Sequence, residues 1–364
     1  MAAAEFIVAI NPGSTSTKVG VYAGERPVFV TALRHTDREL ARFEGRCILD
    51  QRDFRSADIE RTLATVGAFN AKQLAAVVGR GGLLRPLPGG TYRVNAVMLD
   101  ELRLAARGEH ASNLGAFLAQ AAAERAGVEA YVVDPVSVDE WPERARYSGL
   151  ASIQRQCLSH ALNTKAVSKR YAKECYKSYT TLRLIVAHLG SGFSISAHEN
   201  GRMIDVTNSR EEGAFSAERT GTLPIQELVR LCFSGGHSAK EVENLLFHNG
   251  GFYSYLGTRD LAEVERRIDL GDGAAAAVFD AMVYQIGKEI GAMAAVLRGT
   301  VDAVLVTGGM AHSERLVEAL RASVGWIAPM RVYPGEDELQ AMVEGVLRVL
   351  RGEEAARELE PIDG

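Results

Sequence analysis

Short polar side chains follow the first apolar run of the chain. Phe6–Ile10 leads into Asn11-Pro-Gly-Ser-Thr-Ser-Thr-Lys18, and a second apolar run begins at Val19. This pattern predicts a strand, a tight turn and a returning strand. Gly13 lets backbone amides approach a ligand and Lys18 supplies a positive charge, which together suit a phosphate group. The short donors of this turn are Asn11, Ser14, Thr15, Ser16 and Thr17.

This turn is not a Walker A loop. The Gly-x-x-x-x-Gly-Lys spacing is absent, and no helix is indicated after Lys18. The alternative is a polar hairpin turn at the edge of a sheet, without a ligand.

Two more glycine-rich stretches follow apolar runs, His188–Gly192 and Thr307–His312. One such loop could be a simple tight turn. Three of them in an α/β chain point to a nucleotide whose triphosphate lies in a cleft between two domains, with the third loop holding its sugar and base.

Two arginines are candidates for catalysis. Arg80 follows a predicted strand, Leu74–Val78, that ends in glycines, and Arg219 lies in a Gly- and Ser-containing loop. Phosphoryl transfer needs positive charge directed at the phosphoryl oxygens and at an anionic acceptor, and guanidinium groups suit both. A surface ion pair is the alternative, since Glu218 precedes Arg219.

Acidic residues occur at two further places. Asp134 ends the predicted strand Ala130–Val133, and Pro135 stops that strand from continuing. Its carboxylate could bind magnesium, position a substrate or abstract a proton. The cluster Glu336–Glu338 precedes a predicted helix, where it either binds magnesium or complements the helix N-terminus.

The elements that hold these residues form two similar halves. Ile185–Ala187 leads into Gly and Ser residues as the first run does, and Asn200-Gly201 predicts the hairpin turn that follows. A helix over 147–172 is expected to connect the halves, and a buried central helix is expected over 272–299. The predicted domains are 1–155, 156–335 and a C-terminal piece, 336–364, that packs back on the first domain.

Composition restricts the class of protein. A chain of 364 residues is long enough for two domains, and 46 acidic against 41 basic residues give no basic block for nucleic acid. No run approaches the roughly 18 apolar residues of a membrane span, and Met1–Glu5 is too short for a signal peptide. A cytoplasmic protein without membrane or nucleic-acid partners is therefore expected. Its four scattered cysteines predict reduced thiols: Cys47, Cys157, Cys175 and Cys232.

These motifs resemble those of the acetokinase family, which comprises the acetate and butyrate kinases. The resemblance is greatest to the butyrate kinase branch. The similarity runs from residue 6 to about residue 351. Besides Asn11–Lys18 it rests on 79–84, 89–95, 108–115, 187–192, 307–310 and 333–338. It implies two duplicated ribonuclease-H-like domains of the actin, hexokinase and Hsp70 superfamily. It also implies reversible phosphorylation of a short carboxylate by ATP with magnesium, in a homo-oligomer.

The resemblance assigns roles to individual residues. Arg80, Arg219 and Asp134 match catalytic positions. Asn11 and an acid of the cluster Glu336–Glu338 match the metal positions, with Asp337 favoured by its register from Pro334 and Glu338 next to it. The positions that match nucleotide contacts are Asn11, Ser14, Ser16, Lys18, His188, Gly190, Ser191, Gly192, Gly257, Arg259, Gly308, Gly309 and His312.

The chain also departs from the acetate kinases. It has Ser191 where they have Asn, and their transition-state histidine would fall on Gln156. An acid near Gly257 is missing as well. These differences favour butyrate, or another acid longer than acetate, as the substrate, with acetate, propionate and branched-chain acids as the alternatives.

Two other readings predict different chemistry. A sugar kinase or polyphosphatase of the same superfamily would need a true base for a hydroxyl acceptor. A nucleotide switch or filament protein like actin or Hsp70 would hydrolyse ATP slowly with no acceptor.

Overall fold

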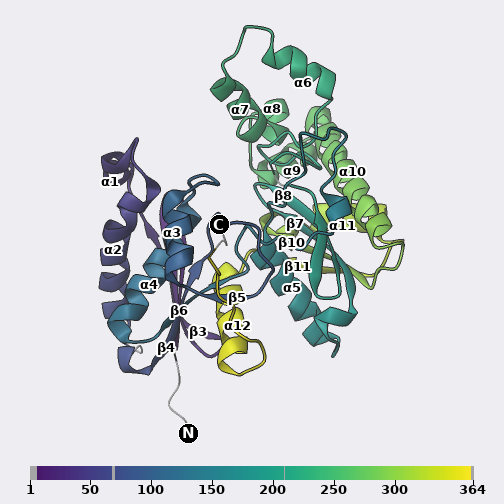
Figure 1. Cartoon of the computed structure of the whole chain (residues 1–364). Helices are drawn as coiled ribbons and strands as arrows, with labels where there is room; N and C mark the ends of the chain where they lie inside the picture. Colours follow the sequence, from purple (N-terminus) through teal and green to yellow (C-terminus); the bar gives the residue numbers. More distant parts are fainter. Residues whose placement is uncertain (1–5, 68–69, 209, 362–364) are drawn as a thin grey trace. The chain divides into compact units, whose positions relative to one another are not determined.

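The computed structural model describes residues 6–67, 70–208 and 210–361 (Figure 1). The segment Met1–Glu5, where no signal peptide is expected, lies outside these residues. The chain divides into unit 1, Met1–Val138 with Asp337–Gly364, and unit 2, Asp139–Glu336. This division comes earlier than the expected boundary at residue 155, because Arg155 is tied to Asp205 and Glu212 of unit 2.

The sheet of unit 1 has six strands in the order β3-β2-β1-β4-β6-β5. The first three form an antiparallel meander, and β1, β4 and β6 run parallel. Their carboxyl ends therefore meet at one edge of the sheet. The strands are β1 (Phe6–Pro12), β2 (Ser16–Ala23), β3 (Arg26–Arg34), β4 (Leu74–Arg80), β5 (Thr91–Arg93) and β6 (Glu129–Val133).

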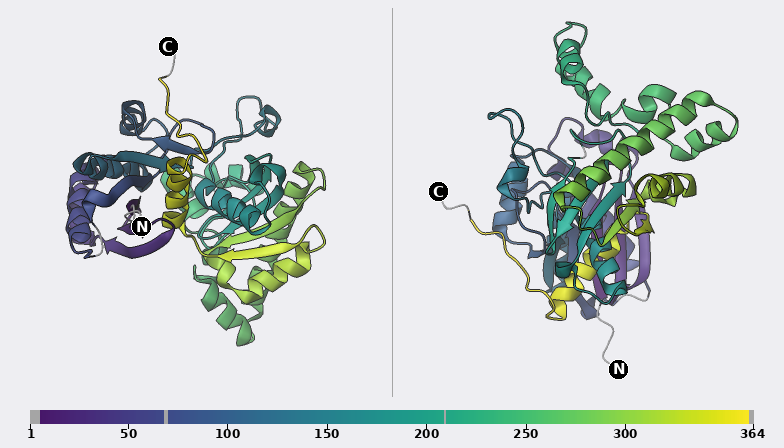
Figure 2. Two further views of the ribbon diagram at one scale, coloured as in Figure 1. Left: turned by 90° about the horizontal axis from the view of Figure 1, so that it is seen from below. Right: turned by 90° about the vertical axis from the view of Figure 1, so that its right-hand side faces the viewer.

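Helices cover both faces of this sheet. The helix α4 packs on one face over β1, β4 and β6, and α12 contacts the same strands from the other face (Figure 2). Close packing of α4 needs glycine at Gly79, where a Cβ would lie 2.0 Å from the carbonyl oxygen of Gly115. The helices are α1 (Asp37–Leu40), α2 (Arg52–Ala64), α3 (Ala96–Leu104), α4 (Leu114–Ala126) and α12 (Glu338–Leu350).

The sheet of unit 2 has five strands in the order β11-β10-β7-β8-β9. It again combines an antiparallel meander, β7-β8-β9, with parallel neighbours, β10 and β11. This order repeats β6-β4-β1-β2-β3 of unit 1 and confirms the predicted pair of similar α/β domains. The turn at Asn200-Gly201 has φ values of 54° and 75°, as a two-residue hairpin requires. The strands are β7 (Arg183–Leu189), β8 (Phe193–Glu199), β9 (Arg202–Val206), β10 (Ala303–Gly308) and β11 (Met330–Pro334).

The connecting helix of unit 2 is shorter than expected. The sequence predicts a connecting helix over 147–172, but the helix found there, α5, covers only Ala161–Glu174. The preceding residues form an irregular segment with a bridge between Tyr147 and Gln154, and the side chain of Arg155 is held in ion pairs.

The long helix α10 (Gly273–Val296) lies where a buried central helix is expected, and it is buried on one face only. Phe279, Ile286 and Ile290 lie in the core, whereas Tyr284 on the other side is 67% exposed. The helical hairpin of α6 and α7 extends away from the sheet of unit 2 (Figures 1 and 2). The remaining helices are α6 (Ile225–Cys232), α7 (Ala239–Phe247), α8 (Gly251–Leu256), α9 (Leu261–Asp269) and α11 (Glu314–Val324). No helix in the described ranges is long and apolar enough to cross a membrane.

Candidate active site

Three predicted residues lie at the carboxyl edge of the sheet in unit 1. Asn11 belongs to the end of β1, Arg80 ends β4, and Asp134 directly follows β6. The strand registers align these ends, with Ile10 opposite Gly79 and Arg80 opposite Val133. Polar side chains at this edge of an α/β sheet are typical of a ligand site.

The first polar turn has the predicted hairpin geometry. We call Asn11–Lys18 the phosphate hairpin. Asn11 pairs with Lys18 across the two strands, and the amide of Gly13 donates to the carbonyl of Ser16 over 2.7 Å. Ser14 and Lys18 are exposed and Ser16 is half-buried, so all three side chains can reach a ligand.

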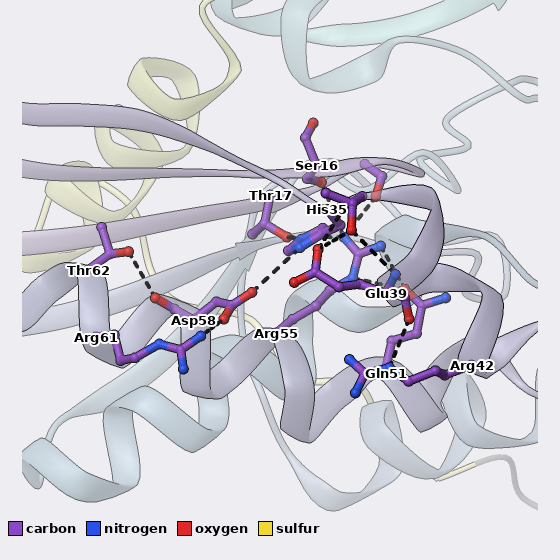
Figure 3. A network of polar contacts seen from close by, with 12 residues as sticks. Ser16, Thr17, His35, Glu39, Arg42, Gln51, Arg55, Asp58, Arg61 and Thr62 are labelled. Atoms are coloured by element: carbon purple, nitrogen blue, oxygen red, sulfur yellow. Dashed lines mark hydrogen bonds and ion pairs between the residues drawn. The ribbon is translucent and has the colours of Figure 1, made fainter.

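The sequence predicts Thr17 as one of the donors of the hairpin, but its side chain does not face solvent. Its side chain is fully buried and contacts His35 Nε2 at 3.0 Å, and it also accepts a hydrogen bond from Arg55 (Figure 3). It therefore supports the hairpin from inside. The alternation of β2 could have indicated this, since Thr17, Val19 and Val21 share one buried face.

The acidic cluster separates into residues with different partners. Glu338 lies at the start of α12, accepts a hydrogen bond from the Asn11 side chain, and has its Oε1 3.3 Å from Arg80 Nη2. Asp337 instead caps α12 by accepting from the Gln340 amide at 3.4 Å. Glu338 is thus the acid next to Asn11.

Arg80 has a free donor at the strand end. The residue is buried, and its Nη1 has no hydrogen-bond partner among the described residues. A buried guanidinium donor without a partner is costly, so an anionic ligand is a suitable occupant of this position.

Asp134 has an unusual backbone. Its φ is 37°, in the left-handed region, where a residue that is not glycine is strained. Two hydrogen bonds with Gly90 hold it: the Gly90 amide donates to Oδ1 over 2.7 Å, and the Asp134 amide donates to the Gly90 carbonyl over 3.0 Å. Strain of this kind at a strand end is typical of functional sites.

The loops of unit 2 also gather at the ends of parallel strands. His188 lies in β7 opposite Thr307 of β10, and Gly308 and Gly335 exchange backbone hydrogen bonds of 3.2 and 2.9 Å. The φ of Gly308 is 92°, and a Cβ there would lie 2.3 Å from the Leu189 carbonyl oxygen. Glycine is therefore required where the two loops meet.

Glu336 lies beside the loop that follows β7. Its Oε1 is 3.0 Å from His188 Nε2, close enough for an ion pair but not aligned as a hydrogen bond. A Cβ on Gly190 would lie 2.9 Å from the same oxygen. The structure thus brings His188, Gly190 and Glu336 together, and Ser191 is exposed at the loop tip.

Arg219 packs directly on Gly192. A Cβ on Gly192 would lie 2.3 Å from Arg219 Nη1. The loop that carries Arg219 is fixed by Ser216, whose hydroxyl donates to the Ser191 carbonyl over 2.6 Å. Burial lowers the pKa of the Arg219 guanidinium from its usual value.

The other predicted nucleotide residues lie in two places. Arg259 stacks over Tyr253, 3.7 Å from the ring centroid, and pairs with Glu218 at 3.1 Å. Gly257 ends α8 with φ 71°, and a Cβ there would meet no atom within 4 Å among the described residues. Gly309 and His312 are exposed in the turn after β10.

His160 is a candidate that the sequence did not single out. Its ring stacks on His188 with centroids 3.9 Å apart, and its Nδ1 lies 2.8 Å from Ser194 Oγ. Gln156, in contrast, is exposed. The position of His160 immediately before α5, four residues after Gln156, could have indicated it.

The residues near Asn11 offer few ligands to a metal ion. No group of three or more His, Cys, Asp or Glu residues suited to a metal occurs in the described part of the chain. Magnesium is usually bound by one or two carboxylates together with substrate phosphates and water. One carboxylate, Glu338, and the amide of Asn11 therefore fit magnesium bound with a nucleotide.

Comparison with known proteins identifies the family of the chain. The acetokinase family model matches residues 150–325. The chain is 47% identical over 352 residues to butyrate kinase 2 of Clostridium acetobutylicum, covering 96% of this chain and 98% of the relative. It is 46% identical to a probable butyrate kinase of Clostridium botulinum over the same shares. Acetate kinase of Porphyromonas gingivalis has the same fold, with TM-score 0.78 at 19% identity over 95% of this chain and 100% of that one. The chain belongs to the acetokinase family.

Proposed function

We propose that this protein transfers the γ-phosphoryl group of ATP reversibly to a short carboxylate, butyrate before acetate, and so forms an acyl phosphate and ADP. The observation that carries the proposal is 47% identity over 96% of the chain to butyrate kinase 2. The strand-end positions of Asn11, Arg80 and Asp134 support it.

The acceptor needs no base. A short carboxylic acid has a pKa of about 4 to 5 and is ionised at neutral pH. Asp134 therefore positions the substrate or the metal and does not have to remove a proton. Its two hydrogen bonds to Gly90 suit a positioning role.

The main obstacle is the approach of two anions. Arg80 offers a buried Nη1 without a partner among the described residues, and it is assigned to the carboxylate or the phosphoryl group. Arg219 is assigned to the charge that develops on the phosphoryl oxygens. Cationic donors that are already in place are worth most where water is excluded.

The nucleotide is assigned to the glycine-rich loops. The phosphate hairpin, with Ser14, Ser16 and Lys18, and the loop 188–192 are proposed to hold phosphates. Gly257, Arg259, Gly308, Gly309 and His312 are proposed to hold the adenosine part. Magnesium bound at Asn11 and Glu338 would neutralise phosphate charge.

A hydroxamate assay tests this function. The protein is incubated with ATP, magnesium and hydroxylamine, and with acetate, propionate, butyrate, isobutyrate or glucose. The proposal predicts hydroxamate with the highest kcat/KM for butyrate and none with glucose. Formation of ADP without hydroxamate, or phosphorylation of glucose, would contradict it.

Self-association and a cytoplasmic location complete the proposal. The apolar side chains of Ile225, Val229 and Phe233 on and after α6 are 79%, 50% and 85% exposed, which supports a homo-oligomer. The four cysteines, all in the described part of the chain, form no disulfide bonds, which supports a reducing compartment. Light scattering after gel filtration is expected to give a dimer or larger species, and a monomer at micromolar concentration would contradict this.

A further inference from the structure

A fully buried arginine lies beneath the phosphate hairpin. Arg55 comes from α2 and is 0% exposed, although it belongs to a charge-rich stretch of the sequence. Arginine is rarely buried this completely unless its donors are satisfied. Figure 3 shows its guanidinium group reaching from α2 to the turn of the hairpin.

The partners of Arg55 are mostly backbone carbonyls of the turn. Nη1 donates to the carbonyls of Gly13 and Ser16 over 2.8 and 3.1 Å, and Nη2 donates to the carbonyl of Ser14 over 3.1 Å. The remaining carbonyl of the turn, that of Thr15, accepts from the backbone amide of His35 over 2.9 Å. All four carbonyls of residues 13–16 are therefore occupied.

This arrangement sets the direction of the amide groups. In a trans peptide the N–H points opposite to the C=O of the same unit. The carbonyls of Gly13 and Ser14, held toward Arg55, thus turn the following amides, those of Ser14 and Thr15, away from it, whereas Ser16 and Thr17 already pair within the sheet. Amides that point together out of a turn form an anion-binding concavity, and carbonyls that pointed the same way would repel the anion.

Arg55 also adds charge under the turn. Its hydrogen bonds in the described ranges end on uncharged oxygens, including two to Gln51 Oε1 at 3.0 and 2.7 Å and one to Thr17 Oγ1 at 3.0 Å. Burial lowers the pKa of the guanidinium to about 10, so it stays protonated at neutral pH. A positive charge without a directly bonded carboxylate is thereby kept behind the hairpin.

We propose that Arg55 is a positioning residue for the phosphate groups of the nucleotide, acting through the carbonyls of Gly13, Ser14 and Ser16. The inference rests on the proposed function, since it takes the ligand of the hairpin to be a nucleotide. Because Arg55 bonds the carbonyls of the phosphate hairpin, its effect is expected on binding of the phosphates and not on binding of the nucleoside.

The experiment compares two ligands in three variants. Affinities for the unreactive ATP analogue AMPPNP with magnesium, and for adenosine, are measured by calorimetry in wild type, Arg55→Met and Arg55→Lys. Arg52→Met on the same helix is the control, since Arg52 is half exposed and pairs with Asp53. Melting temperatures of all variants are recorded.

The expected result is a loss confined to the phosphates. Arg55→Met should weaken AMPPNP binding at least tenfold and adenosine binding less than twofold. The AMPPNP affinity of Arg55→Lys should lie between those of wild type and Arg55→Met, because lysine keeps the charge but not the planar fork. Unchanged AMPPNP affinity, or equal losses for both ligands, would overturn the proposal.

A second variant covers the case in which Arg55→Met does not fold. Gln51→Leu removes the acceptor that holds the other side of the guanidinium while leaving Arg55 in place. It should lower AMPPNP affinity severalfold without affecting adenosine, and an unchanged affinity would count against the proposal. A wild type that binds AMPPNP but forms no acyl phosphate would refute the proposed function and leave this test intact.

Discussion

The carboxylate of Glu338 accepts a hydrogen bond from the side chain of Asn11, 327 positions earlier in the chain. The contact arises because α12 returns to the sheet of unit 1 and starts at the end of β1. It joins the first polar turn to the last acidic cluster, and it distinguishes Glu338 from Asp337, which caps the helix.

A pair of variants should separate the two acids. Glu338→Gln is expected to raise the magnesium concentration for half-maximal activity about tenfold or more, since a charged oxygen ligand is lost. Asp337→Asn should change it little, because asparagine also caps helices. Activity is titrated with magnesium at saturating ATP. Equal effects in both variants would show that the assignment is wrong.

Removal of the Arg219 side chain should slow the chemical step. One donor to a developing negative charge is worth roughly 2.7 to 4 kcal/mol, so Arg219→Ala should lower kcat about a hundredfold or more. Arg230→Ala on α6 is the control, because Arg230 is exposed and pairs with a neighbour on its own helix, Glu227. If Arg219→Ala kept wild-type turnover with an unchanged fold, charge neutralisation by Arg219 would be refuted.

A methyl group at Gly192 should displace Arg219 without unfolding the protein. The Cβ of Gly192→Ala would lie 2.3 Å from Nη1 and 2.8 Å from Cζ of Arg219, and this flexible end can move aside. Misplacement by about 1 Å can cost a hundredfold in rate, so kcat should fall at least tenfold while the melting temperature changes little. Gly291→Ala in α10, where a Cβ meets nothing within 4 Å, should keep full activity. Equal kcat in both variants would contradict this packing argument.

The buried imidazole of His198 should make stability depend on pH. Its side chain is fully buried between Tyr179 and Ser196, and burial, with Lys165 nearby, lowers its pKa to about 3. Below pH 6.5 the unfolded chain binds more protons than the folded chain, because the pKa of this histidine is near 6.5 only when the chain is unfolded. The contribution of His198 to the free energy of unfolding is therefore complete above pH 6.5 and falls as the pH drops. The loss between pH 7.5 and 5 is about 2 kcal/mol for this group.

Denaturant unfolding at several pH values checks this sign. His198→Asn should lose less stability than wild type between pH 7.5 and 5, by about that same amount. His237→Asn, at an exposed position, should follow the wild-type curve. A His198→Asn curve parallel to wild type would contradict the prediction.

The parts of the site that the sequence predicted are those set by local pattern. The phosphate hairpin, the glycine loops and the strand ends of Arg80 and Asp134 follow from apolar runs that break at glycine or proline. The contact of Asn11 with Glu338 depends on α12 returning to β1, so register from Pro334 favoured Asp337, whereas Glu338 is the acid that contacts Asn11. Arg55 was missed because a charged residue in a charge-rich helix is usually exposed, and only the folded chain shows that its partners are carbonyls.

An oxygen-transfer experiment tests the central claim most directly. The protein is incubated with ATP, magnesium and butyrate carrying ¹⁸O at both carboxyl oxygens, and the product is cleaved with hydroxylamine, which attacks the acyl carbon and leaves the bridging oxygen on phosphorus. Direct attack of the carboxylate on the γ-phosphorus predicts one ¹⁸O in each released phosphate. Phosphate free of ¹⁸O, the result of attack by water, would contradict the account.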